Sequence, residues 1–129
     1  MADKIVFLCA KKDIINSLKW IFKEFMKQVE IRQLDTPEKL QGEIGPDGSD
    51  VLILDTEGVN KSLLEFMTEL REQRSSLNTI LIISPVTSRE EIIEIIKANL
   101  VKGIIVRPFT GEVVCKYVEK IFGIQKSGS

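Results

Sequence analysis

The chain has 129 residues, the usual size of one domain, and 43% of them are hydrophobic and 29% charged. Its formal net charge of −1 gives no strong field that would draw it to nucleic acid or to an anionic membrane. The absence of histidine excludes histidine-dependent triads and histidine metal sites. Cys9 and Cys115 show no metal-binding spacing, and no apolar run reaches membrane-spanning length. We therefore expect a cytoplasmic protein with reduced thiols.

The first half of the chain alternates short apolar segments with longer amphipathic ones. Residues 5–8 predict a buried strand, and residues 14–26 predict a helix with Asp13 as its N-cap. Residues 29–34 predict a less buried strand, because their apolar residues mostly alternate with polar ones. The rest of this half indicates the start of a short helix and then a loop, at residues 36–38 and 42–50.

The second half predicts three further strands, each of them apolar, at residues 51–54, 79–83 and 103–106. Helices are predicted at residues 62–74, from residue 88 to 99, and from residue 110 to 122. Ser88 and Glu91 have the spacing of a capping box, and Thr110 is the expected cap of the last helix.

Strands that are apolar throughout and separated by helices indicate a parallel sheet covered on both faces. Right-handed crossovers then give a doubly wound, five-stranded α/β sandwich of the flavodoxin-like (βα)5 type. We expect one domain over residues 1–124 and a polar tail or linker remnant at 125–129. In such sheets, ligands bind beyond the carboxyl ends of the strands.

Three polar side chains follow the predicted strands at that edge. Asp55, Ser84 and Arg107 would bring a carboxylate, a hydroxyl and a guanidinium together, and such a set can handle phosphoryl groups. The simpler alternative is an Asp55–Arg107 pair that only satisfies its own charges, with Ser84 as a turn residue.

Their order and spacing resemble a response-regulator receiver domain of two-component phosphorelays, of the chemotaxis-regulator type, over roughly residues 4–122. The resemblance implies that Asp55 is the phosphoacceptor and that Ser84 contacts the phosphoryl group. Arg107-Pro108-Phe109 then falls on the family's Lys-Pro-Phe triplet, and the bond before Pro108 is expected to be cis. The implied partners are a histidine kinase, another signalling protein, or an output domain of a larger regulator.

The chain departs from that family where the acidic, Mg²⁺-binding pair would lie, because Cys9 and Ala10 stand there instead. Mg²⁺ prefers an octahedron of hard oxygen ligands. Only Asp55, Glu57 and water remain to hold it weakly, and no other cofactor is expected. Since phosphoryl transfer needs positive charge on the equatorial oxygens, we expect phosphorylation of Asp55 to be impaired.

Further departures affect the switching positions of the family. Ile104 replaces the aromatic residue of the last strand, and Val59 replaces a proline after the phosphoacceptor. Pro85 follows the hydroxyl position, where its ring stiffens the loop. Together with the missing acids, these changes indicate a pseudo-receiver held in one state.

The helix from residue 88 to 99 carries four isoleucines that one buried face cannot all accommodate, namely Ile92, Ile93, Ile95 and Ile96. In receivers this helix belongs to the partner surface, so exposed isoleucines would form a docking site for a partner or for a homodimer through the last two helices. The alternative is a broad core face.

Three other functions remain as alternatives. One is a fully competent phosphoacceptor receiver. Another is a flavodoxin-like binder of a small molecule or nucleotide, although no strand is followed by a glycine-rich phosphate loop. A redox role for Cys9 would require an ionised thiol, whereas a small buried residue at a strand end is the simpler interpretation. An enzyme is not expected, because the chain shows no nucleophile–base pair.

Overall fold

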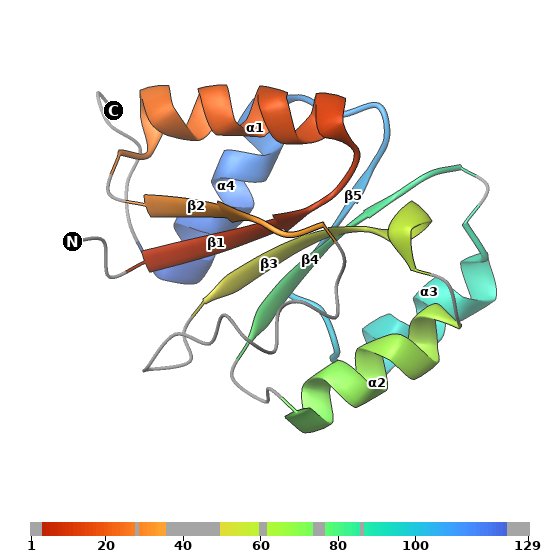
Figure 1. Ribbon diagram of the computed structural model, residues 1–129. Coiled ribbons are helices and arrows are strands. Elements are labelled where there is room, and N and C mark those ends of the chain that lie inside the picture. The colour runs from red at the N-terminus through yellow and green to blue at the C-terminus, as the bar shows by residue number, and fades with distance from the viewer. Residues whose placement is uncertain are drawn as a thin grey trace.

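The computed structural model describes residues 4–27, 29–35, 50–59, 62–73, 77–85 and 87–123. Figure 1 shows a twisted parallel sheet with helices on both sides. The strands are in the order β2-β1-β3-β4-β5, with the bounds β1 Lys4–Cys9, β2 Val29–Gln33, β3 Val51–Asp55, β4 Asn78–Ile83 and β5 Gly103–Val106. This confirms the predicted doubly wound, flavodoxin-like fold. Within the described ranges, no helix is long and apolar enough to cross a membrane.

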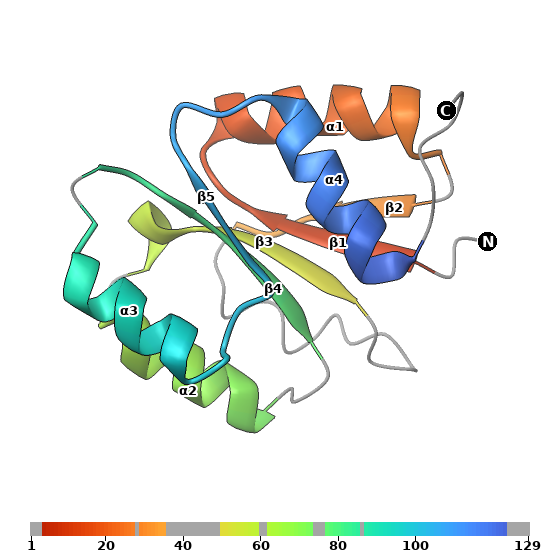
Figure 2. The same cartoon turned by 180° about the vertical axis from the view of Figure 1, so that it is seen from behind.

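Two pairs of helices cover the sheet. Figures 1 and 2 show α1 and α4 on one face and α2 and α3 on the other. Their bounds are α1 Lys12–Phe25, α2 Leu63–Gln73, α3 Arg89–Lys97 and α4 Gly111–Phe122. Each strand alternates between the two cores: Leu8 and Ile53 pack on the α1–α4 face, and Phe7 and Leu52 pack on the α2–α3 face. Both cores are therefore built from the same strands.

The register of the strands brings their carboxyl ends together. Cys9 lies opposite Leu54, and Asp55 lies opposite Ile82. At the far side, Ile83 lies opposite Val106, so Arg107 follows at the same edge. Residues distant in sequence therefore meet at one rim of the sheet.

The start of α1 differs from the prediction. The backbone N–H of Ile15 donates to the carbonyl of Lys11 at 3.0 Å, so helical hydrogen bonding already begins there. Lys11 is the N-cap and has no side-chain cap hydrogen bond, and the prediction of Asp13 as the N-cap is wrong. Asp13 instead lies in the first turn, where its negative charge favours the helix dipole.

Two other predicted caps are present. The side chains of Ser88 and Thr110 accept hydrogen bonds from the backbone N–H groups of Glu91 and Val113. In a full capping box the Glu91 carboxylate would also accept a hydrogen bond from the backbone N–H of Ser88. Here it accepts hydrogen bonds from the start of α2 instead. The predicted helix start at 36–38, most of the loop at 42–50 and the tail at 125–129 lie outside the described residues.

Candidate functional site at the carboxyl edge of the sheet

Asp55 is a buried residue at the end of β3, the central strand of the sheet. Its Oδ1 accepts a hydrogen bond of 3.0 Å from the backbone N–H of Glu57, and this caps the short 3-10 helix η2, Thr56–Gly58. Its Oδ2 lies 3.4 Å from Nη1 of Arg107. Oδ1 is therefore oriented by a hydrogen bond, whereas the buried Oδ2 has the Arg107 charge beside it but no hydrogen-bond partner among the described residues.

Arg107 and Glu57 extend this contact to the start of α1. Nη2 of Arg107 lies 2.7 Å from Oε1 of Glu57, and Oε2 of Glu57 lies 2.6 Å from Nζ of Lys11. We call Lys11, Glu57, Arg107 and Asp55 the ion-pair chain. Its two cations and two anions alternate, so their formal charges cancel at the edge of the sheet.

The ion-pair chain changes the proton affinity of three of its members. The hydrogen bond to Lys11, and then the one to Arg107, hold the pKa of Glu57 below its ordinary value. The same contact with Glu57 raises the pKa of Lys11. Glu57 is also the largest cause of the raised pKa of Arg107. At neutral pH each of these groups therefore keeps its charge.

Burial differs strongly along the ion-pair chain. The side chain of Asp55 is 2% exposed and that of Arg107 is 19% exposed, whereas those of Glu57 and Lys11 are 41% and 58% exposed. Solvent screens the outer Lys11–Glu57 pair more than the inner Arg107–Asp55 pair. The Lys11–Glu57 contact is consequently the one that a change of salt or pH should weaken first.

Ser84 does not join the ion-pair chain. Its hydroxyl lies 3.4 Å from the hydroxyl of Thr87, and its backbone N–H donates to the same oxygen at 3.1 Å. Among the described residues, it has no hydrogen bond to Asp55 or Arg107. The structure thus brings Asp55 and Arg107 together, as the sequence indicated, and holds Ser84 in a local turn.

The other predicted switch positions lie around this edge. Ile104 is half-buried and packs into the core of the α2–α3 face. Val59 follows η2 and packs against the same core, while Pro85 is exposed. The Arg107–Pro108 peptide bond is cis, as the resemblance to the receiver triplet implied.

The residues at this edge do not fit a Mg²⁺ ion. Cys9 is buried in the α2–α3 core and Ala10 packs on the α1–α4 core, so neither offers a carboxylate. Asp55 and Glu57 remain, but cationic nitrogens of Arg107 and Lys11 already lie against them. No group of three acidic or thiol side chains suited to a metal ion occurs in the described part of the chain. A hard divalent ion needs more oxygen ligands than this edge provides.

The four isoleucines of α3 divide between core and surface. Ile95 is fully buried and Ile92 is half-buried against the α2–α3 core. Ile93 and Ile96 are 42% and 56% exposed. One helix face could not bury all four, as the spacing predicted. A docking role for the exposed pair stays a prediction.

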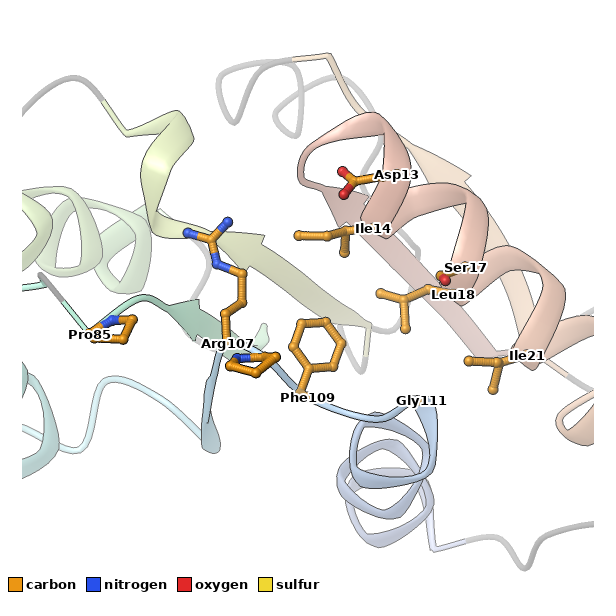
Figure 3. Close-up of a pocket in the computed structure, with 10 residues that line it drawn as sticks. Asp13, Ile14, Ser17, Leu18, Ile21, Pro85, Arg107, Phe109 and Gly111 are labelled. Atoms are coloured by element: carbon orange, nitrogen blue, oxygen red, sulfur yellow. The ribbon is translucent and has the colours of Figure 1, made fainter.

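Sequence reasoning missed two features of the site. One is Lys11, whose position two residues after the end of β1 put it near this edge but fixed no partner for it, and which contacts Glu57. The other is a pocket of about 550 Å³ between α1 and the segment that joins β5 to α4. Figure 3 shows Ile14, Leu18 and Ile21 of α1 facing Phe109 across it, with Arg107 along one wall.

Comparisons with known proteins place the fold. No protein-family profile and no curated sequence matches the chain. Solved structures do match, among them an adenylate cyclase from Rhodopirellula baltica, with 10% identity, a TM-score of 0.75, and coverage of 95% of this chain and 89% of that one. A response regulator from Thermotoga maritima gives 13% identity, a TM-score of 0.73, and coverage of 95% and 99%. A chemotaxis response regulator of Vibrio cholerae gives 19%, 0.70, and coverage of 94% and 99%. At these identities the likeness establishes the fold of receiver domains.

Proposed function

We propose that this chain is a receiver-like signalling domain that acts through protein–protein contacts, and that Mg²⁺-dependent phosphorylation of its Asp55 is impaired. The observation that carries the proposal is the ion-pair chain. Lys11 and Arg107 neutralise Glu57 and Asp55 with charges that belong to the protein itself. A divalent ion would have to displace a lysine contact of 2.6 Å before Glu57 could bind it.

Phosphoryl transfer to a carboxylate explains why this arrangement matters. The transferred group spreads negative charge over three equatorial oxygens, and a catalyst must place positive charge against them. In the ion-pair chain, Arg107 supplies one guanidinium, which Glu57 already neutralises. Asp55 is likewise oriented by the Glu57 N–H and by Arg107. The domain would therefore stay in one state and signal through its surface, without catalytic activity of its own.

The proposed contact surface lies on the α3 face of the sheet. Ile93 and Ile96 are exposed there, and so is Val106 at the end of β5. Val106 lies two residues after Ile104 on β5, so the two side chains point to the same face of the sheet. Because Ile104 packs into the α2–α3 core, Val106 faces the α3 side. Exposed aliphatic side chains on one face suit a protein partner, either a histidine kinase, an output domain or a second copy of this chain. The near-zero net charge argues against nucleic acid or a membrane as partner.

A pair of amide NMR spectra, without and with Mg²⁺ plus beryllofluoride, tests the impaired phosphorylation. Beryllofluoride mimics the phosphoryl group on an aspartate. We expect no shift centred on Asp55, Ser84 and Arg107 at millimolar Mg²⁺. Shifts there that spread into β5 would instead show a competent phosphoacceptor and overturn the proposal.

Two neighbouring lysines provide a matched test of the ion-pair chain as the cause. Lys11→Gln frees Glu57 from its ammonium contact, whereas Lys12→Gln removes an exposed charge that makes no contact with Glu57. Because the edge still has few oxygen ligands and Arg107 remains in place, we expect only weak binding, but Mg²⁺ alone at high concentration should shift the amides of Asp55 and Glu57 more in the Lys11→Gln variant than in the Lys12→Gln variant. Equal responses in both variants would show that Lys11 is not what excludes the ion.

A further inference from the structure

The pocket between α1 and the β5–α4 segment is separate from the Asp55 carboxylate. Its volume of about 550 Å³ lies within the usual range for small-molecule sites. Its apolar wall comes from α1 on one side and from Phe109 and Pro108 on the other, with Ile14, Leu18 and Ile21 on the helix. Such a wall suits the branched aliphatic or aromatic part of a ligand.

Two groups of opposite charge lie toward the same end of this pocket. Figure 3 shows the guanidinium of Arg107 and the carboxylate of Asp13 on its two sides, while Ile21 and Gly111 lie toward the other end. Glu57 is the largest cause of the raised pKa of Arg107, and Asp13 also contributes, so Asp13 lies within electrostatic reach of the guanidinium. The pocket is thus polar at one end and apolar at the other.

Asp13 is an exposed polar group of this pocket and retains unused hydrogen-bonding capacity. Asp13 forms no hydrogen bond or ion pair with any described side chain, although Lys11 and Arg107 lie nearby in the fold. A ligand ammonium at Asp13 would therefore gain a charged partner without displacing one that the protein supplies.

We propose that this pocket binds an apolar α-amino acid as a zwitterion. The ligand carboxylate pairs with the guanidinium of Arg107, and its ammonium pairs with the carboxylate of Asp13. Its side chain packs on Ile14, Leu18 and Phe109. A simple anion would meet the negative charge of Asp13, and a simple cation would meet Arg107, whereas a zwitterion satisfies both.

The ligand site goes beyond the proposed signalling function but shares Arg107 with it. Arg107 lines the pocket and also contacts Asp55 and Glu57. A bound carboxylate therefore adds a third anion around the guanidinium and weakens its hold on Glu57. Binding should be visible at the amides of Glu57 and Lys11 as well as at those that line the pocket.

The test is an amide NMR titration of the full chain with four small molecules. Leucine and phenylalanine are the zwitterions, 4-methylvalerate lacks the ammonium, and isoamylamine lacks the carboxylate. We expect a dissociation constant on the order of 1 mM for at least one zwitterion. The two half-ligands should bind about tenfold more weakly, because each leaves one charged group unpaired. Equal binding of 4-methylvalerate, or no shift with any of the four, would overturn the proposal.

Variants separate the pocket from the rest of the surface. Ser17 lines the pocket from an exposed position of α1, and Asn16 is its exposed neighbour outside the pocket. Ser17→Phe should fill the pocket and abolish the shifts, whereas Asn16→Phe should leave them unchanged. Asp13→Asn provides a second test without added bulk, since it should weaken the zwitterion about tenfold and leave 4-methylvalerate unweakened. A response to Mg²⁺ and beryllofluoride would count against the signalling proposal and would not affect this one.

Discussion

The two helix pairs cover the same sheet with similar apolar cores, yet they are joined differently. On the α2–α3 face, Glu91 accepts hydrogen bonds from the Ser62 hydroxyl at 2.7 Å and from the Leu64 N–H at 3.2 Å. At the opposite end of that pair, Arg71 of α2 donates to the carbonyl of Asn99 after α3. Polar contacts therefore clamp α2 to α3 at both ends.

The α1–α4 pair meets mainly through apolar side chains. Ile21 of α1 lies very close to Gly111 at the start of α4. A Cβ added to Gly111 would lie 1.8 Å from Cδ1 of Ile21. Beyond this contact the pair opens into the 550 Å³ pocket. The difference teaches that hydrophobic burial holds both pairs on the sheet, while directed polar contacts additionally tie α2 to α3.

The largest effect should be the same on both faces. Phe22 of α1 and Met67 of α2 are each 1% exposed in their separate cores. Phe22→Ala should lower the free energy of unfolding by about 3–5 kcal/mol, and Met67→Ala by about 2–5 kcal/mol, because each leaves a cavity. Urea denaturation measures both. A loss below about 1 kcal/mol on one face would show that its core is not packed as described.

The clamp should give a smaller effect, confined to the α2–α3 face. Glu91→Ala removes the acceptor at the start of α2 and should cost about 1–2 kcal/mol, as the loss of a helix cap does. Glu94→Ala on the same helix removes an exposed carboxylate and should stay within about 0.5 kcal/mol. The comparison uses the same denaturation assay, and equal losses would contradict the clamp.

The edge where the two faces meet should show a pH dependence. Because contact with Lys11, and then with Arg107, lowers the pKa of folded Glu57, its contribution to stability is present above its ordinary value of 4.5. That contribution is lost as the pH falls through the lowered pKa of the folded state. Carboxyl-detected NMR should find the Glu57 midpoint below 4.5.

Lys11→Gln sharpens this measurement, because it removes the largest cause of the shift. The Glu57 midpoint should then rise toward 4.5, while Lys12→Gln should leave it where it was. An unchanged midpoint in the Lys11→Gln variant would contradict the 2.6 Å contact.

The smallest effect on stability should come from the exposed surface of α3. Ile96 is 56% exposed, so Ile96→Ser should change the free energy of unfolding by no more than about 0.5 kcal/mol. The same change should weaken any self-association through this face, which sedimentation velocity measures. Ile95→Ser is the opposite case, since Ile95 is fully buried and its loss should destabilise the fold.

Local sequence patterns predicted much of the candidate site. Each strand could be found from its hydrophobic pattern, and Asp55 and Arg107 could be placed at one edge because parallel strands end there together. Ser84 could not be placed, because its hydroxyl had a local partner in Thr87 that competes with the site. Lys11 was equally beyond reach, since a long flexible side chain can find its partner only once η2 is in place.

What the sequence by itself determined is the architecture: the order of strands and helices along the chain, the two-sided burial of the sheet, and the placement of Asp55 and Arg107 at one edge. These follow from hydrophobic period and chain direction, which are local and repeat along each segment. Only the tertiary structure decided that Glu91 would clamp α2, that Lys11 would hold Glu57, and that α1 would stand away from the β5–α4 segment far enough to leave a pocket. Each of these depends on the distance between side chains of different elements, which no pattern within a single segment encodes.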